Sequence, residues 1–220
     1  MNNLLNHQKN YWKNFTNTAD TDTLAADLNA SWDNEKQEYT QYQQIHDAAK
    51  DTVLSSTSCE NVLDFGAGLG RNLKMLEGCF KNVFSFDTQE MCARLNARKL
   101  NYKLIMHKWE DVKELAKNTQ GLDMIFECTV FQHMPPQDFV HKLISSSYIS
   151  RYLYSHTRSY NDFLRTGLTG GLNMLKLIQS TSCWDIVDIT MDEAEAGQLM
   201  DETHYSILLK SKNFNKEASV

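Results

Sequence analysis

From Glu60 onward, short apolar runs alternate with stretches of helical pattern, and this alternation limits the folds available to the chain. The apolar runs have the length of strands, and most of the stretches between them have the length of a helix. Strands that alternate with helices form a parallel sheet that is covered on both faces. The predicted strands span residues 61–65, 82–87, 102–107, 122–128, 148–155, 184–190 and 205–210, and the predicted helices span residues 72–76, 91–100, 111–118, 137–145 and 172–179.

The alternation ends before the last two apolar runs, which follow one another with only a loop between them. Two strands without an intervening helix indicate an antiparallel hairpin at one edge of the sheet. We therefore expect an α/β fold with a seven-stranded, mostly parallel sheet and an antiparallel last strand.

The first 55 residues are polar and contain no run typical of a strand. Within residues 31–54, Trp32, Tyr39, Tyr42 and further apolar side chains recur at spacings of three, four or seven, which predicts an amphipathic helix. We expect a helical N-terminal extension over residues 1–55 and one domain over residues 56–220. The aromatic stripe is typical of a helix packed on a core, and it is also a candidate lid over a ligand, with Tyr39 as a substrate-binding residue.

Three of the nine glycines, Gly66, Gly68 and Gly70, lie close together between the first predicted strand and the helix that follows. Glycines at this point allow a tight turn and a close approach of the backbone to a ligand, and the helix N-terminus offers N–H donors. The next predicted strand ends in Asp87, 21 residues after Gly66. An acid in that position can accept hydrogen bonds from both hydroxyls of a ribose. A glycine-rich turn occurs in other α/β folds as well, but the order of strand, loop, helix, strand and acid favours a nucleoside-containing ligand.

The spacing of the glycines departs from two familiar phosphate-binding motifs. The dinucleotide motif G-x-G-x-x-G requires a third glycine where this chain has Arg71. A Walker loop ends in G-K-[ST], whereas here Gly70 is followed by Arg71 and Asn72. A nicotinamide-dependent dehydrogenase is therefore disfavoured, and tight binding of NADH is the observation that would revive it.

The segment from Asp64 to Gly70, of the form D-x-G-x-G-x-G, resembles the first motif of class I S-adenosylmethionine (SAM)-dependent methyltransferases. Residues 122–135 resemble the fourth-strand motif of the same family, and the strand count and final hairpin resemble its Rossmann-like sheet. The resemblance covers about residues 60–211 and implies SAM as cofactor and S-adenosylhomocysteine (SAH) as product. The cofactor-binding residues that we expect are Asp64, Gly66, Ala67, Gly68, Leu69, Gly70, Asn72, Asp87, Thr88, Met91, Trp109, Glu110, Cys128 and Thr129.

The sequence says less about the methyl acceptor. Pro135 and Pro136 are the only prolines, so the chain has neither the Pro-Cys nucleophile of cytosine-C5 methyltransferases nor an Asn/Asp-Pro-Pro-Tyr clamp for planar nitrogens. The net charge of −6 also disfavours a protein that holds nucleic acid through its phosphates. We expect a small-molecule acceptor, with a peptide or protein group as the alternative, and a non-catalytic module that binds SAM or SAH also stays open.

Candidate residues for the acceptor follow the later strands. His133 comes just after the fourth strand and is the candidate general base, although a residue there can also serve packing alone. Arg158, Tyr160 and Arg165 lie beyond the fifth strand, where two arginines can clamp a carboxylate or phosphate, or can belong to a solvated connection.

The remaining composition excludes some environments. The five cysteines contain no C-x-x-C pair, so no metal site and no disulfide framework is expected. No apolar run has the length of a membrane span, and the first residues do not have the pattern of a signal peptide. We expect a cytoplasmic protein without a membrane partner.

Overall fold

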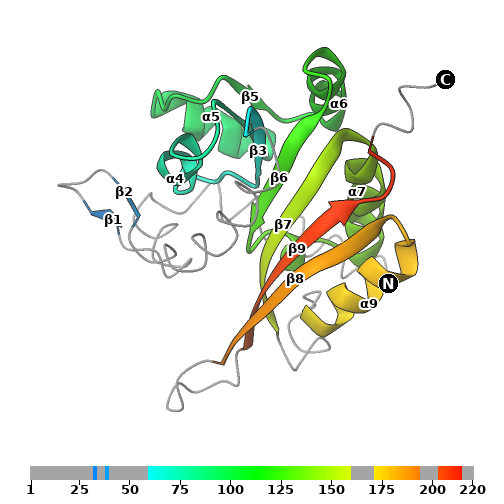
Figure 1. The fold of residues 1–220 in the computed structure, drawn as a ribbon. Coiled ribbons are helices and arrows are strands. Elements are labelled where there is room, and N and C mark those ends of the chain that lie inside the picture. The colour runs from blue at the N-terminus through cyan, green and yellow to red at the C-terminus, as the bar shows by residue number, and fades with distance from the viewer. Residues whose placement is uncertain (1–31, 34–37, 40–58, 160–170, 194–202, 215–220) are drawn as a thin grey trace. The chain divides into compact units, whose positions relative to one another are not determined.

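The computed structural model describes residues 32–33, 38–39, 59–159, 171–193 and 203–214. Seven strands form one sheet in the order β5-β4-β3-β6-β7-β9-β8 (Figure 1). The chain divides into two compact units, residues 1–114 and residues 115–220, and each is described in turn.

The first unit contains three parallel strands and the helices between them. Strand β3 (Asn61–Phe65) pairs with β4 (Asn82–Phe86), and β4 pairs with β5 (Leu104–Met106). Helix α4 (Leu73–Glu77) connects the first two strands, and α5 (Gln89–Ala97) connects the second two. Helix α6 (Trp109–Asn118) follows β5 and continues into the second unit.

The second unit contains the other four strands. Strand β6 (Leu122–Cys128) leads through a short 3₁₀ turn, η1 (Phe131–His133), into α7 (Pro136–Ile149). Strand β7 (Ser150–Ser159) is parallel to β6, and α9 (Gly171–Thr181) precedes β8 (Trp184–Glu193) and β9 (Thr203–Ser211). Strand β9 lies between β7 and β8 and is antiparallel to both (Figure 1).

The central strands are mostly apolar, as expected of strands whose two faces are both covered. Every residue of β6 is buried, as are Val62, Leu63 and Phe65 of β3. Continuous burial of this kind is typical of parallel strands between two layers of helices. Pro136 begins α7, where its missing N–H costs no hydrogen bond.

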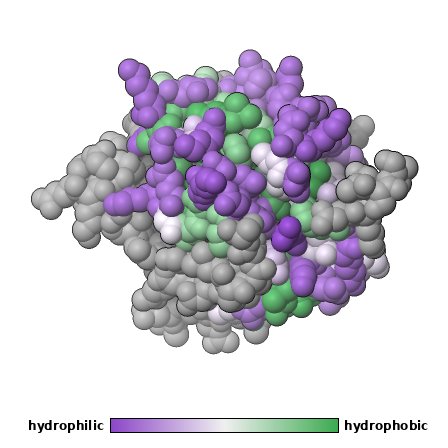
Figure 2. All heavy atoms as spheres, turned by 45° about the horizontal axis from the view of Figure 1, so that its top comes forward, coloured by the Kyte–Doolittle hydropathy of each residue, from purple (hydrophilic) through white to green (hydrophobic). Residues whose placement is uncertain are grey.

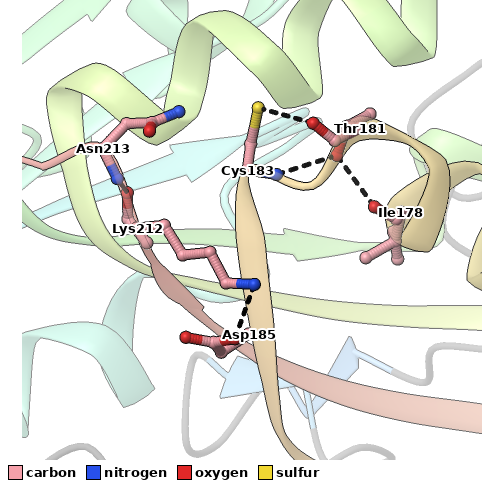
Figure 3. A network of polar contacts seen from close by, with 7 residues as sticks. Ile178, Thr181, Cys183, Asp185, Lys212 and Asn213 are labelled. Atoms are coloured by element: carbon pink, nitrogen blue, oxygen red, sulfur yellow. Dashed lines mark hydrogen bonds and ion pairs between the residues drawn. The ribbon is translucent and has the colours of Figure 1, made fainter.

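Polar contacts fix the turn from α9 into the edge strand β8 (Figure 3). The Thr181 hydroxyl donates to the Ile178 carbonyl at 2.8 Å, and the Cys183 Sγ lies 3.1 Å from the Thr181 carbonyl oxygen. The Cys183 carbonyl in turn accepts the N–H of Lys212 at 3.0 Å, and the Lys212 Nζ lies 2.8 Å from the Asp185 Oδ1. The exposed ion pair contributes about 0–1 kcal/mol, so the turn is held mainly by the contacts of Thr181, Cys183 and Lys212 with backbone carbonyls.

The seven-stranded sheet, its mostly parallel order and its antiparallel last strand confirm the fold expected from the sequence. The helix expected over residues 31–54 is wrong at the four of its residues that the structure describes. Trp32–Asp33 (β1) and Glu38–Tyr39 (β2) pair as antiparallel strands, with Trp32 opposite Tyr39. Aromatic residues favour strands and cross-strand pairs, and here that preference prevails over the helical spacing.

The surface of the described residues is mixed in polarity. On the face drawn in Figure 2, hydrophilic side chains cover much of the described surface, with smaller apolar patches between them. No helix within the described ranges is long and apolar enough to cross a membrane.

Candidate cofactor site

The glycine loop after β3 has a backbone that depends on its glycines. Gly66, Gly68 and Gly70 have φ angles of +74°, +56° and +86°, in the left-handed region that side chains with a Cβ rarely adopt. The Gly66 N–H donates to the Phe86 carbonyl at 2.7 Å, and the Gly70 N–H donates to the Ala67 carbonyl at 2.9 Å. The loop is therefore a fixed turn that is anchored to the end of β4.

Two of these glycines meet different surroundings. A Cβ on Gly70 would lie 2.2 Å from the Leu100 Cδ1 and 3.3 Å from the Leu95 Cδ1, so the neighbouring side chains fill the space there. A Cβ on Gly68 would come no closer than 4.0 Å to the Gly66 carbonyl oxygen. Among the residues that the structure describes, the backbone is thus closely packed at Gly70 and open at Gly68.

Asp87 follows β4 and is bound to this loop. Its Oδ2 accepts the Gly68 N–H at 2.8 Å, and its Oδ1 accepts the Thr88 N–H at 2.6 Å. The pKa of Asp87 is raised from 3.8 to about 6: burial raises it most, the N–H groups of Gly68 and Thr88 lower it, and the nearby Asp64 carboxylate raises it. A carboxylate that accepts two N–H groups still has lone pairs for other donors.

Thr88 begins helix α5 next to Asp87. Its hydroxyl accepts the Met91 N–H at 3.3 Å, which is the usual role of an N-cap threonine. Thr88 is exposed and Met91 is half-buried, so the first turn of α5 presents both polar and apolar atoms beside Asp87.

An aromatic cluster lies at the ends of β3 and β4. The Trp109 ring meets the rings of Phe65 and Phe86 edge to face, with centroids 6.0 and 5.5 Å away. Trp109 is buried, whereas Glu110 in the first turn of α6 is exposed. Trp109 therefore packs on the core, and Glu110 is the member of this pair with atoms open to solvent.

Asp64 occupies a buried position under the loop. Its Oδ1 accepts a hydrogen bond from the Asn72 Nδ2 at 3.0 Å, and its Oδ2 accepts one from the Tyr102 hydroxyl at 2.7 Å. Burial raises the pKa of Asp64, while the hydrogen bonds from Asn72 and Tyr102 and the charge of Arg71 lower it. Ala67 and Leu69 are buried as well. The sequence did not single out Tyr102, because nothing local marks a partner 38 positions away.

In the second unit, a buried carboxylate shapes the turn that follows β6. Glu127 accepts the N–H of Phe131 at 2.9 Å, together with the N–H of Val130 and the hydroxyl of Ser155. Sequence reasoning missed Glu127, although a carboxylate within an apolar strand is a signal for a buried role. Its contacts fix the backbone that leads to His133.

The predicted site residues of the second unit lie in and after this turn. Cys128 and Thr129 are buried, and Thr129 has a φ of +62° and donates its N–H to the His156 carbonyl at 2.7 Å. His133 ends η1, is half-buried, and donates its N–H to the Val130 carbonyl at 2.9 Å.

The remaining expectations lie wholly or partly outside the described residues. Tyr160 and Arg165 fall outside them, and so do the side chains of Tyr39 and Arg158, whose backbones belong to β2 and β7. The structure contains no cluster of three metal-ligating side chains in the described parts of the chain.

Comparison with solved structures shows which fold this is. The N-methyltransferase NodS from Bradyrhizobium japonicum WM9, solved with SAH, is 14% identical and aligns over 87% of this chain and 97% of its own, with a TM-score of 0.60. A SAM-dependent methyltransferase from Anabaena variabilis is 11% identical and aligns over 92% and 93% of the two chains, with a TM-score of 0.59. Magnesium protoporphyrin IX methyltransferase from Synechocystis PCC 6803, solved with SAM, is 14% identical and aligns over 77% and 79%, with a TM-score of 0.54.

These likenesses establish that the chain has the class I SAM-dependent methyltransferase fold. No protein-family model and no curated protein matches the sequence.

Proposed function

We propose that this protein is a SAM-dependent methyltransferase that acts on a small molecule. The observation that carries the proposal is the Asp87 carboxylate, which is bound to the Gly68 N–H of a glycine loop within a class I methyltransferase fold. Several solved structures with this fold hold SAM or SAH. The fold alone does not define a function, so the proposal rests on the residues of this site.

The described residues fit an adenosyl cofactor. Gly68 leaves the backbone open to a ligand, and Asp87 offers carboxylate oxygens to the two hydroxyls of a ribose. Thr88 and Met91 follow Asp87 in the first turn of α5, and Glu110 lies in the first turn of α6. Each is exposed or half-buried, and we assign them to the ribose and adenine. The buried Ala67, Leu69, Asn72 and Trp109 support the same loop and strand ends from the core.

Methyl transfer from SAM requires alignment of the acceptor with the methyl group more than activation of the leaving group. SAM, when bound, supplies a methyl group on a positively charged sulfur that is already a good leaving group. The residues of this chain then have to hold the acceptor in line with that methyl group and exclude water, and positioning of this kind contributes up to about 7–11 kcal/mol in favourable cases. Where the acceptor keeps its proton at neutral pH, we assign its removal to the imidazole of His133.

The acceptor class rests on the sequence. The chain lacks the proline motifs of enzymes that methylate nucleic acid bases, and its net charge is −6. We assign Arg158 and Arg165 to an anionic group of the acceptor, and Tyr39 and Tyr160 to its remaining surface. Two of the solved structures with this fold agree with that choice. Magnesium protoporphyrin IX methyltransferase is named for a small molecule, and NodS is named an N-methyltransferase.

Calorimetry with purified protein tests the cofactor. We expect SAM and SAH to bind with Kd in the micromolar range, about −8 kcal/mol, and NADH to bind far more weakly. Incubation with methyl-tritiated SAM and fractions of small-molecule extract, followed by separation of labelled products, tests transfer. Tight binding of NADH would overturn the proposal. SAH binding without any labelled product would indicate a non-catalytic module that binds SAM or SAH.

A further inference from the structure

The glycine loop is supported on its core side by residues that precede β5. Leu100 and the ring of Tyr102 fill the space next to Gly70, with the Tyr102 Cε2 3.6 Å from where a Gly70 Cβ would lie. The Lys103 N–H donates to the Val83 carbonyl at 2.9 Å, which fixes this segment to β4. The segment is therefore a rigid support against which the loop rests.

The Tyr102 hydroxyl reaches the loop through Asp64. Asp64 is the fourth residue of β3, and Asn72, its second donor, is the N-cap of α4. The carboxylate thus joins the strand that enters the loop to the helix that leaves it, and Tyr102 completes the bridge from the segment before β5. One carboxylate with two donors holds both ends of a loop that has three glycines and little stiffness of its own.

Asp64 depends on these two donors. It is buried completely, and a buried carboxylate that loses a donor is strongly disfavoured. Its register partner on β4, Ser85, is also buried, yet the Ser85 hydroxyl makes no hydrogen bond among the described residues. Ser85 thus does not donate to Asp64 in this structure, and removal of the Tyr102 hydroxyl takes away the donor that the Asp64 Oδ2 has.

We propose that Tyr102 is a positioning residue for cofactor binding, whose hydroxyl acts through Asp64 to hold the glycine loop in the shape that the cofactor requires. The inference rests on the proposed function for its ligand and on the observed hydrogen bonds for its mechanism. Tyr102 touches the loop from the core and takes no part in the chemistry. In the same way, Asp64 serves the cofactor through the loop.

Tyr102→Phe is the first test, because it keeps the ring against Gly70 and removes only the hydroxyl. We expect the Kd for SAH to rise about tenfold, and the amide of Gly70 to exchange with solvent about tenfold faster in the ligand-free protein. Asp64→Asn is the second variant: its amide oxygen can still accept from Asn72 and the Tyr102 hydroxyl can turn to accept from its NH₂, but the negative charge that strengthens both hydrogen bonds is lost. The double variant should bind SAH no more than about twofold more weakly than the weaker single variant.

Tyr154→Phe is the matched control. Tyr154 is also buried and also donates its hydroxyl, at 3.2 Å to the Ser206 Oγ, but in the second unit. This control should lower the melting temperature and leave the SAH affinity and the Gly70 exchange rate within about twofold of wild type. Circular dichroism verifies the fold of each variant.

The two readouts separate this inference from the proposed function. If Tyr102→Phe leaves the exchange of Gly70 unchanged, or if Tyr154→Phe accelerates it equally, the inference is wrong whatever the ligand. If Tyr102→Phe does not fold, the same criteria apply to Asp64→Asn. If wild type does not bind SAH, the proposed function fails, and the inference fails with it as a statement about the cofactor.

Discussion

The carboxylate of Asp87 accepts a 2.8 Å hydrogen bond from the backbone N–H of Gly68, 19 positions earlier in the chain. This contact ties the end of β4 to the open part of the glycine loop. It brings together the two features from which the sequence predicts a nucleoside site, a turn without side chains and an acid. A ribose that binds here meets both features at once.

Replacement of Asp87 should weaken cofactor binding in a folded protein. We expect Asp87→Ala to cost about 2–4 kcal/mol of SAH binding free energy, because two hydrogen bonds to a charged acceptor are lost. Calorimetry gives the change in Kd. Asp188→Ala, which removes an exposed carboxylate from the edge strand β8, is the control and should bind SAH as wild type does. An unchanged Kd in folded Asp87→Ala would show that the ribose does not bind at this carboxylate.

The raised pKa of Asp87, about 6, predicts how SAH affinity depends on pH. In the proposed site, ribose hydroxyls donate to the ionised carboxylate, so binding should be constant above pH 7 and weaken as the pH falls through 6, approaching tenfold per pH unit. The Asp64 carboxylate contributes to the pKa shift, so the Asp87→Asn variant is needed to assign the pH dependence to Asp87. That variant should lose the step near pH 6.

The same pKa has an opposite consequence for the stability of the ligand-free protein. A folded-state pKa above the unfolded value means that the folded state holds its proton more tightly, so this group stabilises the fold below pH 4 and loses that contribution as the pH rises through 6. Chemical denaturation of wild type and Asp87→Asn between pH 4 and 7 measures the difference. Relative to wild type, the free energy of unfolding of Asp87→Asn should increase by about 1–3 kcal/mol as the pH rises from 4 to 7.

Gly68 and Gly70 should respond differently to alanine. At Gly70 a methyl group would enter space held by Leu100 and Leu95 at a φ of +86°, so Gly70→Ala should lower the free energy of unfolding by about 2–4 kcal/mol. At Gly68 no atom of the described residues would crowd the methyl group, so we expect only the backbone cost of about 1–2 kcal/mol. Gly68→Ala should nevertheless weaken SAH binding, because in the proposed site the added methyl group would face the cofactor. Equal losses of stability in the two variants would contradict this difference.

Glu127 should matter for the stability of the turn after β6. Glu127→Ala leaves the part-buried N–H of Val130 and the buried N–H of Phe131 without this acceptor and should cost about 2–5 kcal/mol in denaturant unfolding. Glu127→Gln is the matched variant. Its amide oxygen can still accept both N–H groups, and the Ser155 hydroxyl can turn to accept from its NH₂, so the loss should be clearly smaller.

Much of the fold follows from the sequence, and the exceptions have physical causes. Strands β3 and β6 have the predicted bounds, and glycines with positive φ mark one end of each: Gly66 follows β3 and Gly121 precedes β6. The sequence predicts that Tyr148 begins a strand, but it belongs to α7, which continues to Ile149, and β7 begins only at Ser150. Tyr102 precedes β5 instead of beginning it, and its hydroxyl goes to Asp64. Single side-chain hydrogen bonds of this kind join distant positions, and no local pattern encodes them.

His133 gives the sharpest test of the chemistry. Its ring is half-buried at the end of η1, and its own N–H fixes the turn through Val130, so His133→Ala removes the imidazole and keeps that backbone bond. If the imidazole removes a proton from the acceptor, kcat should fall by about 10²–10⁴ with SAH affinity unchanged, and the low-pH limb of the rate profile should disappear. His133→Gln, which keeps polar volume but accepts no proton near neutrality, should be equally impaired. Nearly full activity in the Gln variant would show that His133 only packs, because an amide can replace the imidazole in packing and hydrogen bonding but cannot replace it as a base.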